Sequence, residues 1–337
     1  MLKNKLKLLP IILIISLLLT SCQQKIYCIE SQNFLMDTLM KIQIFTPNSK
    51  FSLSPYFDIL EDLDKRYDRH WDNSFLYKLN HGTYNGSFTK DDLKILNKAS
   101  YYYDKTEGLF DISIAPLLDL WDINSDSPKV PIQKEIDNLL PNVGFSKINF
   151  DSEILSIPPN IEIDFGAILK GFATDKLKEK LSKDNISSAL IDLGGNIYAH
   201  GYKPDGTDWK IGIRNPEENA NDYVGILSVH DKAVVTSGIY ERYFIENNNI
   251  YHHILNPQNG YPVQNNLLSV TIVSENGLDA DILSTACFLM GLEKGLSFVN
   301  KLENVDAIFI TKKRQLYLSS NLYDYWQQTD SNFVAIY

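Results

Sequence analysis

Two short stretches of the chain place carboxylates, hydroxyls and a lysine beside glycines. The first covers residues 164–175 and contains Lys170, and the second contains Asp281, Ser284 and Thr285. Magnesium prefers carboxylate, hydroxyl and carbonyl oxygens and usually keeps waters and substrate phosphates in its shell, so one or two protein carboxylates are enough. The two stretches therefore suggest a magnesium site for a substrate that contains a diphosphate.

The first stretch has the form of a strand followed by a helix. Asp164 ends an apolar run, and Lys170 with Gly171 opens the expected helix, so backbone amides and the lysine ammonium could both face an anion. The spacing is not that of a Walker motif, and a turn of this kind is by itself more often structural.

The second stretch has helical spacing. Asp281, Ser284 and Thr285 stand at i, i+3 and i+4, which places them on one face of a helix, where a carboxylate and a hydroxyl could share a metal. The alternative is an N-capping aspartate followed by small packing residues.

Three weaker signals add polar groups. The glycines of 192–196 permit a close backbone approach to a ligand or form a turn. Ser237 and Gly238, after an apolar run, could bind a phosphate or belong to a loop. His252 and His253 are adjacent in an expected strand, so they point in opposite directions, and one of them could be a general base. A zinc site is disfavoured because no cysteine or third histidine is suitably spaced.

Composition limits the classes of protein. The net charge of -10 argues against a nucleic-acid surface, which needs clustered lysine and arginine. Only Cys28 and Cys287 accompany Cys22, too few for a disulfide framework. With 44% hydrophobic residues, the chain can bury a sizeable core.

The amino terminus predicts export. Lysines at positions 3, 5 and 7 precede an apolar run over 8–19, which is shorter than a membrane span and typical of a signal peptide. The residues before Cys22 resemble a bacterial lipobox, in which the cysteine carries the lipid. We expect a lipoprotein signal peptide over 1–21 and a polar tether over 22–34, with acyl chains that hold the protein at a membrane surface. The alternative is a signal anchor with an incidental cysteine.

Apolar patterns from residue 35 onward predict strands and helices. Residues 39–45 alternate as a half-buried strand, and Ser54 followed by proline is typical of a helix N-cap. A second helix is expected over 89–104 and should stop at Gly108. Two apolar runs between 148 and 165 flank a pair of prolines and predict a hairpin.

The remaining elements complete an α+β domain over 35–337. Asn247-Asn248-Asn249 predicts a hairpin turn, because asparagine tolerates positive φ. Short connections favour antiparallel sheets with flanking helices. Further strands are expected over 188–192, 197–200, 209–213, 224–229, 233–235, 242–245, 251–255 and 268–273, helices over 171–182, 280–290 and 292–302, and a closing hairpin over 307–318.

Taken together, these segments resemble the ApbE family of flavin transferases, which attach FMN from FAD covalently to a threonine of a target protein. The motifs occur in the family order over nearly the whole mature chain: Met36-Asp-Thr38, Asp111 to Leu117 with Trp121, Asp164 to Asp175, Asp192 to Gly195, Thr236-Ser-Gly238 with Tyr240 and Arg242, His253 to Pro257 with Gly260-Tyr-Pro262, and Ala280-Asp281 to Thr285.

The resemblance implies roles for individual residues. Magnesium would be held by the Ala167 carbonyl, Asp281 and Thr285, with Ser284 where the family can have a second acidic ligand. His253 matches the base that deprotonates the acceptor threonine. FAD would lie in a cleft between the halves of an α+β fold. Its contacts would include Met36, Leu109, Phe110, Asp111, Asp164, Lys170 and Ile254, with His70 at the flavin-stacking position. From their residue types, Ser237 and Gly238 are also expected to contact the phosphates of FAD.

The chain departs from the family pattern at two further positions. Asp37 stands where the family often has glycine between the methionine and threonine of the first motif. His70, beside Trp71, stands where an aromatic residue, commonly tyrosine, stacks on the flavin.

The expected function is transfer of FMN from FAD to a threonine of an extracytoplasmic redox protein, with release of AMP. Magnesium and Lys170 would neutralise the diphosphate while His253 activates the threonine. The alternatives are an FAD pyrophosphatase that uses water in the same site and a flavin-binding lipoprotein without catalysis. The sequence does not identify the acceptor, the membrane leaflet, the number of metals or the oligomeric state.

Overall fold

A mixed layer of nine strands forms the centre of the molecule. The computed structural model describes residues 25–150, 155–217 and 222–336. Every pair in this sheet is antiparallel except the parallel pair of β14 and β16. The strands in spatial order are β1 (Tyr27–Leu35), β2 (Thr38–Thr46), β5 (Ala189–Leu193), β6 (Asn196–His200), β9 (Lys232–Gly238), β12 (Leu267–Ser274), β13 (Val305–Thr311), β14 (Gln315–Leu318) and β16 (Val334–Ile336).

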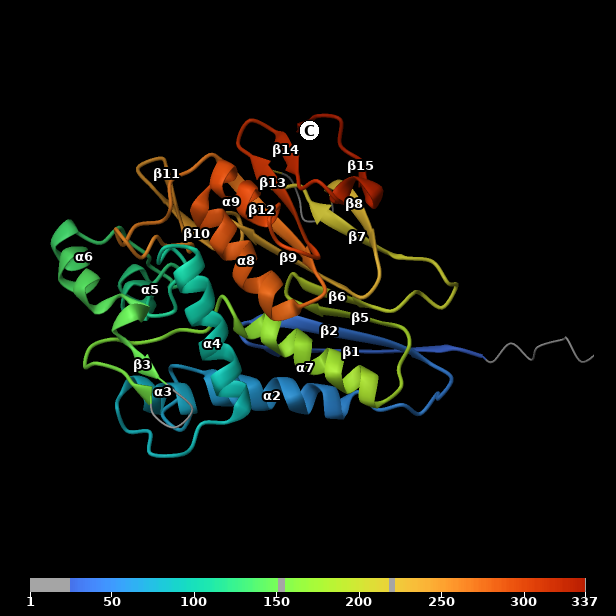
Figure 1. Ribbon diagram of the computed structural model, residues 1–337, viewed down its shortest axis with the longest axis horizontal. Helices are drawn as coiled ribbons and strands as arrows, with labels where there is room; N and C mark the ends of the chain where they lie inside the picture. The colour runs from blue at the N-terminus through green and yellow to red at the C-terminus, as the bar shows by residue number, and fades with distance from the viewer. Residues whose placement is uncertain (1–24, 151–154, 218–221, 337) are drawn as a thin grey trace, which may run out of the picture.

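Helices cover one face of the sheet, and a smaller sheet packs on the other. In Figure 1, α7 and α8 lie in front of the strands, and α8 contacts β9 and β12, while α2 packs on α7 and α4 packs on α8. The described helices are α2 (Ser54–Tyr67), α3 (Phe75–Asn80), α4 (Lys90–Lys105), α5 (Ala115–Trp121), α6 (Gln133–Leu139), α7 (Leu169–Lys183), α8 (Gly277–Met290) and α9 (Leu292–Val299). The smaller strands are β7 (Trp209–Arg214), β8 (Tyr223–Val229) and β15 (Trp326–Gln328), with hairpins of β3 (Asn149–Phe150) and β4 (Leu155–Ser156) and of β10 (Tyr243–Glu246) and β11 (Asn249–His252).

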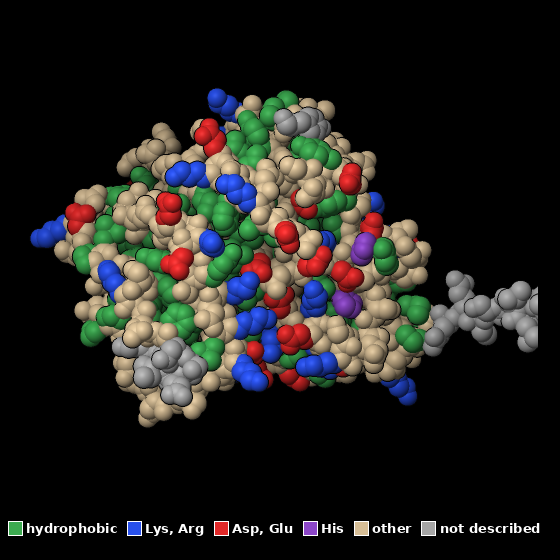
Figure 2. All heavy atoms as spheres, in the orientation of Figure 1, with side chains coloured by type: hydrophobic (Ala, Val, Ile, Leu, Met, Phe, Trp, Pro, Cys, Tyr) green, Lys and Arg blue, Asp and Glu red, His purple; other side chains and the backbone are tan. Residues whose placement is uncertain are grey.

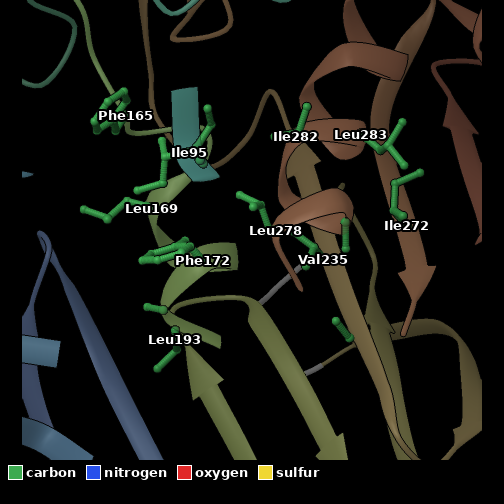
Figure 3. Close-up of a cluster of buried hydrophobic side chains, with 14 of the residues drawn as sticks. Ile95, Phe165, Leu169, Phe172, Leu193, Val235, Ile272, Leu278, Ile282 and Leu283 are labelled. Atoms are coloured by element: carbon green, nitrogen blue, oxygen red, sulfur yellow. The ribbon is translucent and has the colours of Figure 1, made fainter. Parts of the chain in front are cut away.

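Strand β13 shows why the central sheet is apolar on both faces. Ala307 and Phe309 belong to the core under the helices, whereas Ile308 and Ile310 belong to the core under the smaller sheet. Successive side chains of a strand point to opposite faces, so a continuous apolar run fills two cores at once. Figure 3 shows the first of these cores, where Phe172 of α7 and Leu278, Ile282 and Leu283 of α8 lie over Val235 and Ile272 of the sheet.

Charged residues on the helical face occur in pairs of opposite sign. Figure 2 shows lysine, arginine and acidic side chains mixed across the lower middle of the face that it displays. Ion pairs connect Lys98 with Asp279 at 2.6 Å and Lys176 with Asp91 at 2.9 Å. These pairs link α4 to the start of α8 and to α7.

Most predicted elements are confirmed, with shifts of a few residues. The helix expected at Thr89 is α4, and Thr89 forms a capping box with Asp92: each side chain accepts a hydrogen bond from the other residue's backbone N–H. The turn between β10 and β11 has positive φ at Asn247 and Asn248, as its sequence predicts. Helix α2 is capped at Leu53 rather than at Ser54.

Two local predictions are wrong, and one alternative does not hold. Of the tether expected over 22–34, residues from Tyr27 onward form β1, which pairs with β2 along nine residues. The hairpin is formed by β3 and β4 before the two prolines, and the segment that follows them makes only an isolated bridge between Ile114 and Glu162. Ser237 and Gly238 are the end of β9, not a loop.

The leader lies outside the described residues. The signal peptide expected over 1–21 and the lipidation site at Cys22 are therefore not part of this structure. No helix in the described part of the chain is long and apolar enough to cross a membrane.

Candidate functional site

The candidate site is built where the first turns of α7 and α8 touch. A Cβ atom added to Gly171 would lie 2.3 Å from the Gly277 carbonyl oxygen and 2.5 Å from the Asp281 Cβ. A Cβ added to Gly277 would in turn lie 2.7 Å from the Gly171 carbonyl oxygen. The two helices therefore approach at backbone distance, which only glycine permits.

This close approach places the Asp281 carboxylate at the start of α7. Asp281 Oδ2 accepts a hydrogen bond from the Gly171 N–H at 2.8 Å. That N–H lies in the first turn of α7 and has no partner within the helix, and the Ala167 carbonyl lies just before the helix begins. Between described residues no hydrogen bond reaches the Ala167 carbonyl. The Ala167 oxygen and the remaining lone pairs of the Asp281 carboxylate are thus both available as ligands.

A chain of hydroxyls orients Thr285. Ser284 Oγ donates to the Asp281 carbonyl at 2.8 Å, and it also lies 2.8 Å from Ser237 Oγ, which is 3.2 Å from Thr285 Oγ1. Because the one Ser284 proton goes to a carbonyl, Ser237 donates to Ser284, and Thr285 can donate to Ser237. The lone pairs of the Thr285 oxygen are then free to face a cation.

Ser284 has a different environment from Thr285. Its side chain is fully buried, and its hydroxyl is engaged at both the proton and the oxygen, whereas Thr285 is partly exposed. The geometry therefore makes Ser284 and Ser237 supports for Thr285. The structure does not present Ser284 as a free ligand.

The donor set fits a hard cation such as magnesium. It consists of a buried carboxylate, a backbone carbonyl and a hydroxyl, all oxygen atoms, and magnesium needs few protein ligands when phosphates complete its shell. Among the described residues there is no group of three or more His, Cys, Asp and Glu side chains that could hold a metal. A zinc-type cluster is therefore absent from that part of the chain.

Lys170 connects this carboxylate with the predicted base. Burial raises the pKa of Asp281, while Lys170 and the Asn196 amide lower it. Lys170 is also near enough to His253 to lower its pKa. The Asn196 side chain is buried beside this carboxylate, so its amide helps to hold the charge of Asp281.

His253 is fixed in one orientation by the backbone of Arg242. The Arg242 carbonyl accepts from the His253 backbone N–H at 3.1 Å and lies 3.2 Å from Nδ1. A carbonyl only accepts, so Nδ1 carries the proton of the neutral ring and Nε2 is left as a free base. Although the residue keeps some exposed surface, protein surrounds it, and burial lowers the pKa of its imidazole to about 4.

His252 has a structural role. It is buried, its Nε2 lies 3.1 Å from the Val263 carbonyl, and its Nδ1 accepts from the Ile254 N–H at 3.3 Å. This arrangement requires the neutral ring with the proton on Nε2, and burial lowers the pKa of His252 to about 4. Protonation of Nδ1 would break the bond to Ile254, next to the predicted base.

We expect His252 to make the fold sensitive to acid. Its pKa falls from 6.5 to about 4 on folding, so the unfolded chain binds the extra proton first. The stability that neutral His252 provides is complete above pH 6.5 and is lost as the pH falls toward 4, by roughly 3 kcal/mol at 1.4 kcal/mol per pKa unit.

Urea unfolding at pH 7 and pH 4.5 tests this prediction. In His252→Asn the amide oxygen replaces Nδ1 as an acceptor but does not titrate, so the variant should lose less stability between the two pH values than the wild type. An equal loss in both proteins would contradict the assignment.

Other predicted contacts are held by partners that are distant in sequence. Asp164 forms an ion pair with Arg69 Nε at 3.0 Å, and it accepts the Gly166 N–H at 2.7 Å. Asn80 bonds to both the N–H and the carbonyl of Ile163, at 2.9 Å each. These contacts fix the segment that leads to Ala167. Sequence analysis missed Arg69 and Asn80, and no local pattern marks them.

The remaining predicted flavin contacts lie on several elements. Asp111 is buried, burial raises its pKa, and its carboxylate accepts from Ser113 and from the Phe145 N–H. Phe110 and Ile254 are buried, and Leu109 is partly buried. Their contacts with FAD, which the family resemblance implies, stay predictions.

Met36 and His70 lie near a surface hollow. Burial raises the pKa of the Asp64 carboxyl, and the nearby Met36 backbone lowers it. A hollow of about 240 Å³ is lined by Asp64, Lys65, Asp68 and Trp71. His70 is exposed beside it and donates its backbone N–H to Asp68. Met36 itself has φ of 49°, in a turn between β1 and β2. The hollow thus brings the first motif close to Trp71.

Replacement of Gly171 by alanine should destabilise the fold by about 3 kcal/mol, the upper end for overpacking. The added methyl group would meet the backbone of Gly277, which cannot rotate away as a side chain could. Urea unfolding measures the effect, with Glu179→Ala at an exposed position of α7 as the control. A Gly171→Ala protein as stable as this control would show that the helices can separate without cost.

Comparisons with known proteins agree on one family. The model described as ApbE family matches residues 36–309. A FAD:protein FMN transferase from Klebsiella pneumoniae (strain 342) is 37% identical over 233 residues, which cover 68% of this chain and 72% of that protein. One from Treponema pallidum (strain Nichols) is 30% identical over 319 residues, which cover 88% of each.

Solved structures show the same fold. The ApbE protein from Thermotoga maritima has a TM-score of 0.79 and 26% identity, covering 90% of this chain and 100% of that one. The flavin transferase ApbE from Vibrio cholerae has a TM-score of 0.79 and 23% identity, covering 89% of this chain and 100% of that one. The α+β prediction is confirmed by these likenesses.

Proposed function

The chain belongs to the ApbE family of FAD:protein FMN transferases, and we propose that it uses magnesium to transfer FMN from FAD to a threonine of another protein, with release of AMP. The observation that carries the proposal is the buried Asp281 carboxylate at the start of α7, where it accepts the Gly171 N–H and where no described residue bonds to the Ala167 carbonyl.

The metal would be held by Ala167, Asp281 and Thr285. When bound, magnesium supplies positive charge that stabilises the diphosphate as negative charge develops on it. Lys170 adds a second cation, since it is near enough to Asp281 and His253 to affect the pKa of both. Lys170 occurs in none of the ion pairs found among the described residues, so its ammonium is not neutralised by a carboxylate within 4 Å.

His253 would act as the general base. Its Nε2 takes the proton of the acceptor hydroxyl, the threonine oxygen forms a bond to the FMN-side phosphorus, and the bond from that phosphorus to the bridging oxygen breaks. The bridging oxygen leaves with AMP. The Arg242 carbonyl holds the Nδ1 proton throughout and keeps Nε2 free for this step.

We also propose an extracytoplasmic location with lipid on Cys22. The charged flank, the short apolar run and the cysteine in the leader support this location. The acceptor would then be a redox protein on the same side of the membrane.

The test is mass spectrometry of the protein without its first 22 residues, incubated with FAD, magnesium and an acceptor domain that bears a flavinylation threonine. We expect the acceptor to gain the mass of FMN and AMP to form in equal amount. AMP without the adduct would overturn the transferase proposal in favour of a pyrophosphatase. If several acceptor domains give neither AMP nor the adduct, the result would indicate a protein that binds flavin without catalysis. Asp281→Ala is the control for contaminating activity.

A further inference from the structure

The start of α8 is held by a carboxylate from α7. Asp175 is 6% exposed, and its Oδ1 accepts the Gly277 N–H at 2.7 Å while its Oδ2 accepts the Leu278 N–H at 3.2 Å. The first N–H groups of a helix have no partner within that helix. The Asn276 side chain accepts the N–H of Asp279, the residue after Leu278. The first turn of α8 is therefore fully bonded only with Asp175 present.

The same contact occurs in the opposite direction. Asp281 of α8 accepts the Gly171 N–H in the first turn of α7. Asp175 stands four residues after Gly171, and Asp281 stands four residues after Gly277. Each helix therefore has in its first turn a glycine that touches the other helix, and one turn later a carboxylate that accepts from the other helix's backbone. We call these four residues the reciprocal clasp.

The clasp sets where the Asp281 carboxylate lies. The Gly171 N–H is in the first turn of α7 and has no partner within that helix, and Asp281 accepts it at 2.8 Å. The position of Asp281 depends on how far α8 is shifted along α7. Asp175 fixes that shift through two hydrogen bonds at the other end of the contact.

We propose that Asp175 is a positioning residue for the metal site. Without its two bonds, α8 would move away from α7, the Gly171 N–H would lose Asp281 as its acceptor, and the site would lose the oriented carboxylate. Asp175 would not touch the metal. This inference rests on the proposed function, because it takes Asp281 and Ala167 as metal ligands.

The test measures metal binding directly. Mn²⁺ replaces magnesium as the probe and is titrated by electron paramagnetic resonance into the protein without its first 22 residues, saturated with FAD. We expect Asp175→Asn to weaken Mn²⁺ binding about tenfold and Asp175→Ala by up to about a hundredfold, the range for residues that orient metal ligands. Saturating metal should restore most of kcat. A merely structural cap would instead lower the active fraction and leave the affinity of the folded fraction unchanged.

Asp279→Asn is the matched control. Asp279 lies in the same turn of α8, but it bonds to Lys98 at 2.6 Å and to Tyr102 at 2.9 Å on α4, away from α7. This variant should lose stability and keep its affinity for Mn²⁺. Wild-type affinity in Asp175→Asn would overturn the inference, and if Asp175→Ala does not fold, Asp175→Asn decides alone. Wild-type affinity in Asp281→Ala would instead overturn the metal assignment of the proposed function.

Discussion

The Asp281→Ala enzyme is expected to lose FMN transfer by a factor of about 100 to 1,000. A metal that stabilises developing charge contributes several kcal/mol, and each 1.4 kcal/mol is tenfold in rate. The substitution removes the buried carboxylate that would hold the metal, and it takes away the negative charge that lies near Lys170. Single-turnover transfer at saturating FAD, measured at increasing magnesium, gives the effect.

The loss should not come from unfolding. Asp281→Asn keeps an oxygen that can accept the Gly171 N–H, so it should fold like the wild type and still fail in transfer because it lacks the charge. Circular dichroism and urea unfolding check the fold of both variants. Transfer at the wild-type rate in the absence of magnesium, by either variant, would be incompatible with Asp281 as a metal ligand.

His253→Asn should lower kcat by a factor of about 100 to 10,000, the range for loss of a general base. The asparagine Nδ2 can still donate to the Arg242 carbonyl, as Nδ1 does now at 3.2 Å, so the local backbone should keep its conformation. What disappears is Nε2, the atom that would take the threonine proton. FAD binding, measured by fluorescence quenching, should change little.

A pH profile separates this role from a structural one. With a pKa of about 4, His253 is neutral at pH 7, and the wild-type rate should fall only as the pH approaches that value. Bound diphosphate adds negative charge and would shift this fall to higher pH. His253→Asn should show no such fall. A residual rate with the wild-type pH dependence would mean that another group takes the proton.

Local signals in the sequence predicted many element boundaries well. Thr89 and Asp92 mark the start of α4 because both halves of a capping box lie within three residues. The β1 strand was not predicted, because it is at the edge of the sheet and mostly exposed on both faces. Its sequence therefore carries no apolar alternation. What makes it a strand is its pairing with β2, which no local pattern contains.

The same limit applies to the site. Lys170, Asp281 and Thr285 stand in short motifs whose residue types and spacing alone suggest phosphate and metal chemistry. Asp175 and Arg69 act through partners 102 and 95 residues away, so their roles follow only from the packing of α7 on α8 and of the 161–168 segment on its neighbours. A motif identifies the groups that react, and long-range contacts decide how they are held.

The early start of β1 also sets how far above a bilayer this enzyme could work. With lipid on Cys22, as we propose, only residues 23–26 separate the anchor from Tyr27, and four extended residues reach about 14 Å. The nine residues of β1 then rise about 30 Å at 3.4 Å each, to the turn at Met36. The flavin contact expected at Met36 could stand no more than roughly 45 Å from the lipid headgroups. An acceptor that is itself held at the same membrane would lie within this reach.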